Sequence, residues 1–212
     1  MNITLIGASG FIGTAILNEA LARGHHVSAL VTRPERIAAR ANLAVQAADV
    51  MDVATLTAQF DQADAVVSAF SGHAQADVLD YYLAGVRSII SAAKEARAPR
   101  LLMVGGAGAL EVAPGVQLID TPDFPAQYKA TAEGARQALQ LLRKEAALNW
   151  TMLSPSAVIA PGQRSASFRT SLDQLITAAD GSSRISVEDF AMALVDELEQ
   201  PAHPRQRFTV GY

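Results

Sequence analysis

The chain has 212 residues, of which 50% are hydrophobic, and it carries a formal net charge of −4. This length suits one domain with a substantial core, and the acidic balance argues against the basic face that nucleic-acid binding requires. The sequence contains no cysteine, which excludes disulfides, thiolate metal sites and cysteine nucleophiles.

Membrane and metal binding are also not expected. No apolar run approaches the ~20 residues that cross a bilayer, and a strand expected from residue 2 leaves no place for a signal peptide. The four histidines show no metal-ligand spacing. We therefore expect a cytoplasmic protein that binds neither nucleic acid, nor membrane, nor metal.

Short aliphatic runs alternate with longer helical patterns, which is typical of βαβ units. The alternation predicts an α/β domain with a Rossmann-type, doubly wound parallel sheet. Strands are expected at 2–6, 26–31, 43–47, 64–69, 100–104 and 150–153. Helices are expected at 11–23, 34–40, 53–59, 77–97 and 127–147.

The rhythm changes after Pro155, where residues 157–186 are rich in Ser, Gly and Arg. Asp180-Gly181 predicts a hairpin turn, and a helix near 187–199 and a strand at 208–210 follow. We expect a single domain, 1–212, in which 155–212 form a small C-terminal lobe on the substrate side. This lobe either shapes a substrate pocket or only caps the sheet.

The first strand opens directly into Gly7-Ala8-Ser9-Gly10-Phe11-Ile12-Gly13. Glycines at this spacing, between a strand and a helix, allow a tight turn, the approach of a pyrophosphate and close packing of the helix. The segment predicts a dinucleotide site. Its cofactor-binding residues are expected to be Gly7, Ser9, Gly10, Phe11, Ile12 and Gly13.

The residues after the second strand bear on the choice of dinucleotide. NAD-binding sites place a carboxylate there for the ribose 2′-hydroxyl, whereas this chain has Arg33. A guanidinium pairs well with a 2′-phosphate, so the sequence favours NADP(H) over NAD(H). The alternative is that Arg33 is a solvated loop arginine.

Two further strand ends supply cofactor candidates. Asp49 and Val50 follow the third strand, where such folds usually contact adenine. Asp49 could instead cap a helix, and the two roles do not exclude each other. Ala69, Phe70 and Ser71 follow the fourth strand, and small residues there permit close backbone approach, although a simple turn explains them as well.

The chain resembles the short-chain dehydrogenase/reductase superfamily, in which a tyrosine and a lysine four residues later move a proton. No such pair exists here: Tyr81, Tyr82 and Tyr128 are followed at that spacing by Gly85, Val86 and Ala132. A dehydrogenase or isomerase acting on a sugar or steroid is therefore disfavoured.

The chain is more similar to the atypical branch of that superfamily, the NmrA-like and NAD(P)H–flavin reductase-like proteins. The segments that carry this resemblance are 7–13, 32–35, 104–108, 124–129, 153–156 and 184–191. The resemblance implies a nicotinamide cofactor along the strand ends, including Gly105. It also implies that Lys129 lies near the nicotinamide ribose and that Pro155 and Ser156 lie near the carboxamide.

These observations predict an NADPH-dependent reductase of a flavin, quinone or similar planar acceptor, with flavin as substrate and no catalytic side chain. Such an acceptor takes hydride directly and needs mainly positioning. Phe70, His73, Tyr128 and Phe168 are candidates for the acceptor pocket. The alternative is a non-catalytic NADP(H)-binding redox sensor, and a homodimer is left open.

Overall fold

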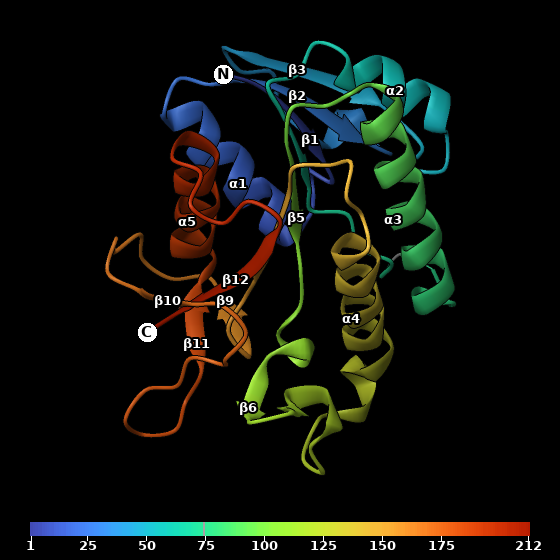
Figure 1. Ribbon diagram of the computed structural model, residues 1–212. Coiled ribbons are helices and arrows are strands. Elements are labelled where there is room, and N and C mark those ends of the chain that lie inside the picture. Colours follow the sequence, from blue (N-terminus) through green and yellow to red (C-terminus); the bar gives the residue numbers. More distant parts are fainter. Residues whose placement is uncertain (74) are drawn as a thin grey trace.

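An eight-stranded sheet runs through the molecule in the order β10-β12-β8-β5-β4-β1-β2-β3 (Figure 1). The computed structural model describes residues 1–73 and 75–212. All neighbouring strands pair in parallel except β10, which is antiparallel to β12. The strands are β1 (Asn2–Ile6), β2 (His26–Val31), β3 (Leu43–Ala47), β4 (Ala65–Ser68), β5 (Leu101–Val104), β8 (Trp150–Ser154), β10 (Arg169–Ser171) and β12 (Gln206–Gly211).

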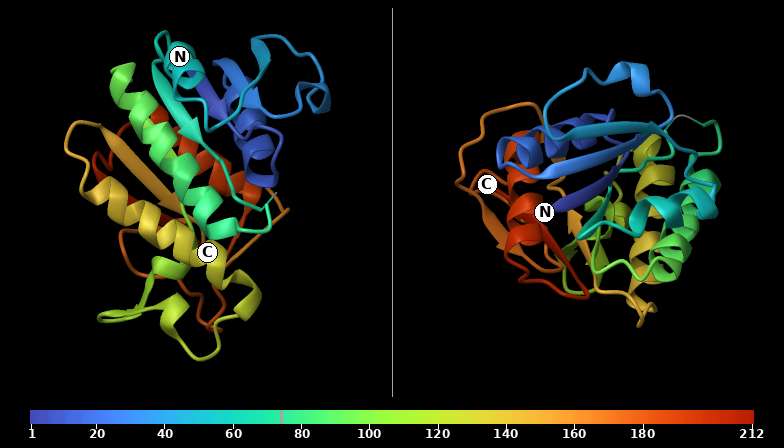
Figure 2. Two further views of the ribbon diagram at one scale, coloured as in Figure 1. Left: turned by 90° about the vertical axis from the view of Figure 1, so that its right-hand side faces the viewer. Right: turned by 90° about the horizontal axis from the view of Figure 1, so that it is seen from above.

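Helices cover both faces of this sheet, as the right-hand view of Figure 2 shows. Helices α1 (Phe11–Ala22) and α5 (Val187–Glu199) pack together on one face. Helices α2 (Val53–Phe60), α3 (Val78–Glu95) and α4 (Lys129–Arg143) cover the other. Neighbouring strand residues alternate between the two cores, so that Leu5 faces α1 and α5 while Ile6 faces α3. The predicted Rossmann-type fold is confirmed.

The last connection between parallel strands, from β8 to β12, has the opposite handedness to the earlier connections. The chain moves from β4 through β5 and β8 to β12 in one direction, with α3 and α4 on one face, but α5 lies on the opposite face beside α1. Almost all β–α–β connections are right-handed, so the β8–α5–β12 connection is an exception. Residues 155–186, between β8 and α5, lie at the carboxyl edge of the sheet.

The helix predicted at 34–40 is wrong. The chain forms only a 3₁₀ turn, η1 (Pro34–Arg36), and Ile37 is already extended. Pro34 suits the start of a helix, but of residues 35–42 only Ile37 packs against the core. A short segment without an apolar face to bury does not hold a helix in water.

The hairpin predicted around Asp180-Gly181 is also wrong, although the turn exists. Gly181 has a φ of +79°, and the amide of Ser182 donates to the Asp180 side chain at 2.9 Å. The flanking strands, however, pair with other partners. Strand β11 (Arg184–Ser186) pairs in parallel with β9 (Val158–Ala160), and β10 pairs with β12.

Several short elements were not predicted because two or three residues carry no periodicity. A small hairpin, β6 (Glu111–Ala113) and β7 (Val116–Gln117), follows β5, with η2 (Ala107–Ala109) before it and η3 (Leu118–Asp120) after it. The predicted helix 127–147 is shorter, because η4 (Ala126–Tyr128) precedes α4.

None of the helices in the described part of the chain has the length and apolar character needed to cross a membrane.

Candidate functional site

The glycine loop begins with a residue that only glycine fits. Gly7 has a φ of +78°, in the left-handed region that side chains disfavour. Its amide donates to the carbonyl oxygen of Leu30 at 3.0 Å, and a Cβ at this position would lie 2.7 Å from the Ala69 carbonyl oxygen. The loop is thus held against both neighbouring strands.

Gly13 brings the first turn of α1 onto the loop. A Cβ there would lie 2.0 Å from the Gly7 carbonyl oxygen, which only glycine avoids. The Gly7 carbonyl also accepts the Gly10 amide at 3.0 Å. Thr14, which the sequence analysis did not single out, donates its hydroxyl to the Ala8 carbonyl oxygen at 3.1 Å. The only sequence signal for this contact is a threonine in the first turn of the predicted helix.

The start of α1 offers free donors to a ligand. Gly10 is the N-cap residue and supplies no side-chain cap, so the N–H groups of the first turn lack intrahelical acceptors. Ser9, Gly10 and Phe11 are exposed. Together with the positive end of the helix dipole, this arrangement fits a diphosphate.

The loop also lies where an open α/β sheet binds ligands. From β1 the chain proceeds to β2 on one side, and from β4 it proceeds to β5 on the other. The crevice at the carboxyl ends of such a pair of strands is the usual cofactor site. Ala69 and the exposed Ser71 come directly after β4, and Ala69 lies against Gly7, so the two strand ends meet at this point.

Arg33 lies exposed after β2, and within residues 1–73 and 75–212 no carboxylate or other acceptor engages its guanidinium. Its side chain is available to a phosphate. Asp49 makes a tight turn, since its carboxylate accepts the Met51 amide at 2.9 Å. The cap of α2 is Asp52, which accepts the Thr55 amide at 3.0 Å, so the helix-cap alternative for Asp49 is wrong.

Two predicted cofactor residues direct their side chains into the core. Val50 is 6% exposed and belongs to the core cluster on the α3 side. The Phe70 ring stacks on Tyr82 with centroids 5.8 Å apart, and a Cβ at Gly85 of α3 would lie 2.4 Å from that ring. Both side chains therefore pack against the core on the α3 side.

Gly105 and Ser156 have structural partners at the carboxyl ends of β5 and β8. A Cβ at Gly105 would lie 2.8 Å from the Met152 sulfur and 2.9 Å from the Ser154 hydroxyl. The buried Ser156 hydroxyl donates to the Val210 carbonyl oxygen at 2.8 Å. Pro155 is buried beside it. These contacts explain the residue types without a cofactor and leave the predicted cofactor roles as predictions.

Three large side chains with apolar surface are well exposed toward the carboxyl edge of the sheet. Phe11, Tyr128 and Val158 are 51%, 56% and 58% exposed. Phe11 follows β1, Tyr128 precedes α4 and Val158 follows β8. All three therefore lie toward the carboxyl edge of the sheet. Lys129, which begins α4, and His73 are also exposed, whereas Phe168 packs against the core on the α1 side.

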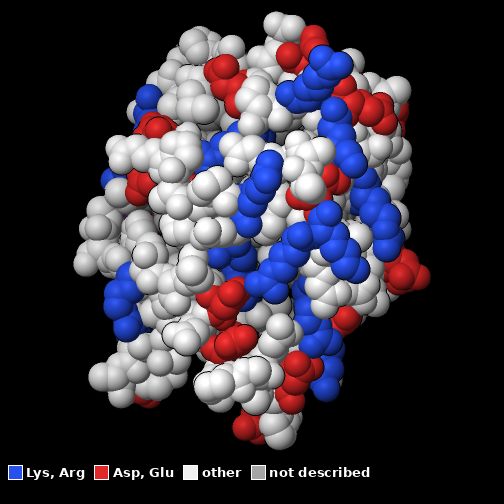
Figure 3. All heavy atoms as spheres, in the orientation of Figure 1, with Lys and Arg blue, Asp and Glu red and all other residues white. Residues whose placement is uncertain are grey.

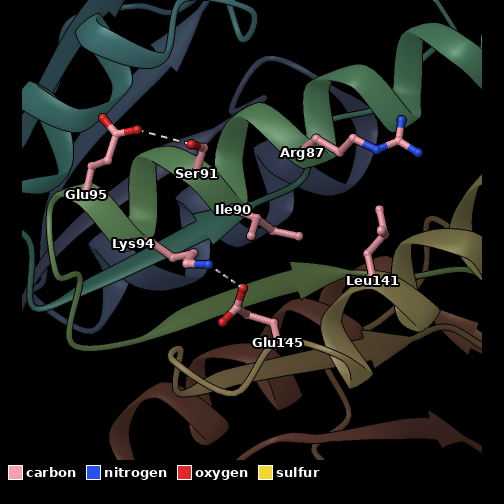
Figure 4. Close-up of a pocket in the computed structure, with 7 residues that line it drawn as sticks. All are labelled: Arg87, Ile90, Ser91, Lys94, Glu95, Leu141 and Glu145. Atoms are coloured by element: carbon pink, nitrogen blue, oxygen red, sulfur yellow. Dashed lines mark hydrogen bonds and ion pairs between the residues drawn. The ribbon is translucent and has the colours of Figure 1, made fainter.

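A groove of about 430 Å³ lies elsewhere, between α3 and α4 (Figure 4). Ile90 and Leu141 form its floor, and the Lys94–Glu145 ion pair, at 3.0 Å, closes one end. Figure 3 shows basic side chains along the same two helices, with acidic ones between them. None of the predicted site residues lines this groove, so it is separate from the crevice.

The fold and the glycine loop define a dinucleotide-binding Rossmann domain. Residues 7–201 match the model of the NAD(P)H-binding family, and the chain belongs to that family. The predicted resemblance to NAD(P)H–flavin reductase-like proteins is confirmed.

The relatives cover the chain from end to end. The uncharacterized protein YwnB of Bacillus subtilis is 41% identical over 99% of this chain and 98% of its own length. The structure of a proposed epimerase from Bacteroides thetaiotaomicron is 42% identical, with a TM-score of 0.94 over 100% of this chain and 96% of that one. A proposed NADH–flavin reductase from Streptococcus pneumoniae is 32% identical, with a TM-score of 0.88 over 100% and 99%.

Proposed function

We propose that the protein is an NADPH-dependent reductase that transfers hydride to a flavin, a quinone or a similar planar acceptor. The observation that carries the proposal is the glycine loop, in which Gly7 and Gly13 leave no space for a Cβ and α1 begins without a side-chain cap. Membership of the NAD(P)H-binding family supports the same nucleotide class.

The residues of this chain would bind and orient the nucleotide. The backbone from Gly7 to Gly13 and the first turn of α1 would hold the diphosphate, and Arg33 would pair with the 2′-phosphate. Ala69 and Ser71, at the end of β4, would line the site beside Gly7. When bound, the reduced nicotinamide supplies the hydride.

The acceptor side supports a planar, largely apolar substrate. Phe11, Tyr128 and Val158 offer apolar surface near the strand ends, and stacking an acceptor there is a matter of positioning. Tyr128 has Ala132 rather than a lysine four residues later. A flavin or quinone accepts hydride at a ring atom and can take its proton from water, so the missing relay does not prevent this reaction.

Two relatives support different nucleotides or reactions. The name of the S. pneumoniae relative supports a flavin acceptor but specifies NADH, whereas Arg33 supports NADPH. The B. thetaiotaomicron relative is a proposed epimerase, but this chain lacks the tyrosine–lysine pair that such chemistry uses in short-chain dehydrogenases. We therefore place reduction before epimerisation.

The decisive experiment follows the absorbance of NADPH and NADH with a panel of flavins and quinones. Steady oxidation of NADPH in the presence of one of these acceptors is the expected result. A Gly10→Val variant, whose side chain would project at the exposed start of α1, should lose both binding and turnover. Tight NADPH binding without turnover on any acceptor would reject the reductase and favour a redox sensor.

A further inference from the structure

Residues 161–167, between β9 and β10, are exposed yet bonded to the helices beneath them; we call this segment the strap. The Gly162 amide donates to Glu188 at 2.9 Å. The Gln163 carbonyl oxygen accepts the Ser186 hydroxyl at 2.8 Å. Both partners lie at the start of α5, so the first half of the strap is fixed to that helix.

Asp189 of α5 fixes the second half. Its carboxylate is completely buried and accepts the Ser165 hydroxyl at 2.5 Å, the Ala166 amide at 2.9 Å and the Tyr212 hydroxyl at 2.7 Å. Burial acts to raise the pKa of Asp189, but these hydrogen bonds outweigh it and hold the pKa below its usual range. Ala166 has a φ of +57°, a conformation that alanine adopts only when its surroundings impose it.

Arg164 joins the strap to the other helix, α1. Its guanidinium donates two hydrogen bonds to the carboxylate of Glu19, at 2.8 Å and 2.7 Å. The Arg164 side chain is 47% exposed and that of Glu19 only 9%. A two-point, charge-assisted contact of this kind fixes orientation as well as distance, and it is the main cause that lowers the pKa of Glu19.

The two ends of the strap lead to the acceptor side. The exposed Val158 precedes it on β9, and Phe168 follows it directly. Arg169 pairs with Gly211 at the carboxyl end of β12, so Phe168 lies beyond that edge of the sheet. Glu19 belongs to the helix whose first turn carries the nucleotide loop. The Arg164–Glu19 contact therefore links the acceptor side to the nucleotide helix.

We propose that Arg164 is a positioning residue, which holds the acceptor side of the site at a fixed place relative to α1. This inference rests on the proposed reductase activity. Because Glu19 lies more than two turns beyond Phe11, the first residue of α1, loss of the contact changes the acceptor site and leaves the nucleotide site intact.

The first test distinguishes an effect on acceptor binding from an effect on nucleotide binding. Arg164→Gln should raise the KM for the acceptor ~10-fold, the factor that loss of a charge-assisted pair of bonds produces. The kcat and the Kd for NADPH should change by less than about twofold, because the glycine loop and the first turn of α1, which would hold the nucleotide, keep all their contacts. Arg164→Lys should recover part of the loss. Arg184 of β11 is exposed and has no ion pair among the described residues. The control variant Arg184→Gln should therefore behave like the wild type.

The second test does not depend on turnover. Trypsin cleaves after arginine, and the bond after Arg164 should be protected while the strap is fixed. In Glu19→Gln, which retains Arg164, cleavage there into residues 1–164 and 165–212 should be ~10-fold faster, because the local opening that exposes the bond becomes more frequent.

The outcomes distinguish the two proposals. If no acceptor is reduced, the proposed function fails, and the Kd of flavin mononucleotide, from fluorescence quenching, replaces KM as the measure of the acceptor site. Faster cleavage together with a raised KM or Kd supports the positioning role. Unchanged cleavage in Glu19→Gln, or an unchanged KM and Kd in Arg164→Gln, overturns it.

Discussion

The guanidinium of Arg100 and the carboxylate of Glu197 form a buried ion pair at the amino edge of the sheet, opposite the glycine loop. Their side chains are 6% and 3% exposed. Arg100 also donates to the Glu197 carbonyl oxygen, and the carboxylate accepts the amide of His203 at 2.9 Å. Arg100 precedes β5 and Glu197 lies in the last turns of α5, so the pair ties this helix to the sheet far from the nucleotide.

Glu197→Gln should destabilise the protein by ~3–4 kcal/mol, because it leaves the Arg100 guanidinium buried without a counter-charge. Urea unfolding measures the loss. Glu145→Gln, which breaks the surface pair with Lys94, should cost less than about 1 kcal/mol. The Kd for NADPH of the folded Glu197→Gln protein should stay unchanged. Equal losses of stability in the two variants would show that burial of the pair has no importance.

The stability should fall in acid. Burial acts to raise the pKa of Glu197, but hydrogen bonds from His203, Ala202 and Arg100 hold the pKa below its usual range, and the pKa values of Asp189 and Glu19 are also lowered. A depressed pKa in the folded state gives stability that is present above the unfolded value, about 4.3 for glutamate, and is lost as pH falls through the folded value. The free energy of unfolding should therefore be nearly constant from pH 7 to about 5 and decline below ~4.3.

Urea titrations at a series of pH values check this decline, with Glu197→Gln as the control. Its curve should be flatter in acid than that of the wild type, since one of the titrating carboxylates is gone. A wild-type curve that rises as pH falls below ~4.3 would contradict the assignment of these depressed pKa values.

The sheet could be predicted from the sequence because parallel strands buried on both faces are continuous apolar runs. The strand expected at 64–69 is β4 (Ala65–Ser68), and that expected at 2–6 is β1. The helix predicted at 34–40 is wrong because Pro34 signals a helix start, while of residues 35–42 only Ile37 packs against the core. The strands of residues 158–186 escaped it because each is held by a partner distant in sequence.

The candidate site likewise contains a part that the sequence predicted and a part that it did not. The glycine loop is local, so spacing alone located Gly7, Gly10 and Gly13. The helix expected near 187–199 also begins close to where the structure shows it, after Ser186, whose hydroxyl accepts the Asp189 amide at 3.0 Å. The other partners of Asp189, and the Arg164–Glu19 contact, join residues far apart in sequence, and no periodicity or spacing encodes such pairs.

Gly13→Ala should prevent correct folding of the nucleotide loop. The added Cβ would lie 2.0 Å from the Gly7 carbonyl oxygen, whereas at Gly10 the corresponding distance is 3.3 Å. Overpacking against backbone costs ~3 kcal/mol or more, so Gly13→Ala should lower the free energy of unfolding by that amount and abolish NADPH binding. Gly10→Ala should remain close to wild-type stability. A stable Gly13→Ala protein that binds NADPH normally would contradict the observed approach of α1 to the loop.

Ser156→Ala tests whether a predicted cofactor residue acts through its side chain. The hydroxyl donates to the Val210 carbonyl oxygen at 2.8 Å inside the protein, so its removal should cost ~1 kcal/mol of stability. Because the hydroxyl proton is already used, the Kd for NADPH should change by less than about twofold. Thermal unfolding and nucleotide titration measure the two effects. A large loss of NADPH affinity at unchanged stability would instead assign the hydroxyl to the nucleotide.

Arg33→Ala tests the nucleotide preference. Arg33 is exposed and unpaired within the described chain, so its loss should leave the free energy of unfolding within about 0.5 kcal/mol of wild type. If the guanidinium binds the 2′-phosphate, NADPH binding should weaken by ~1.5–3 kcal/mol, which is roughly 10- to 100-fold in Kd. NADH lacks that phosphate and should bind as before. Arg36→Ala, in the same exposed turn, is the matched control and should affect NADPH much less. Equal weakening of NADPH and NADH in Arg33→Ala would exclude a phosphate contact and leave Arg33 as a solvated loop residue.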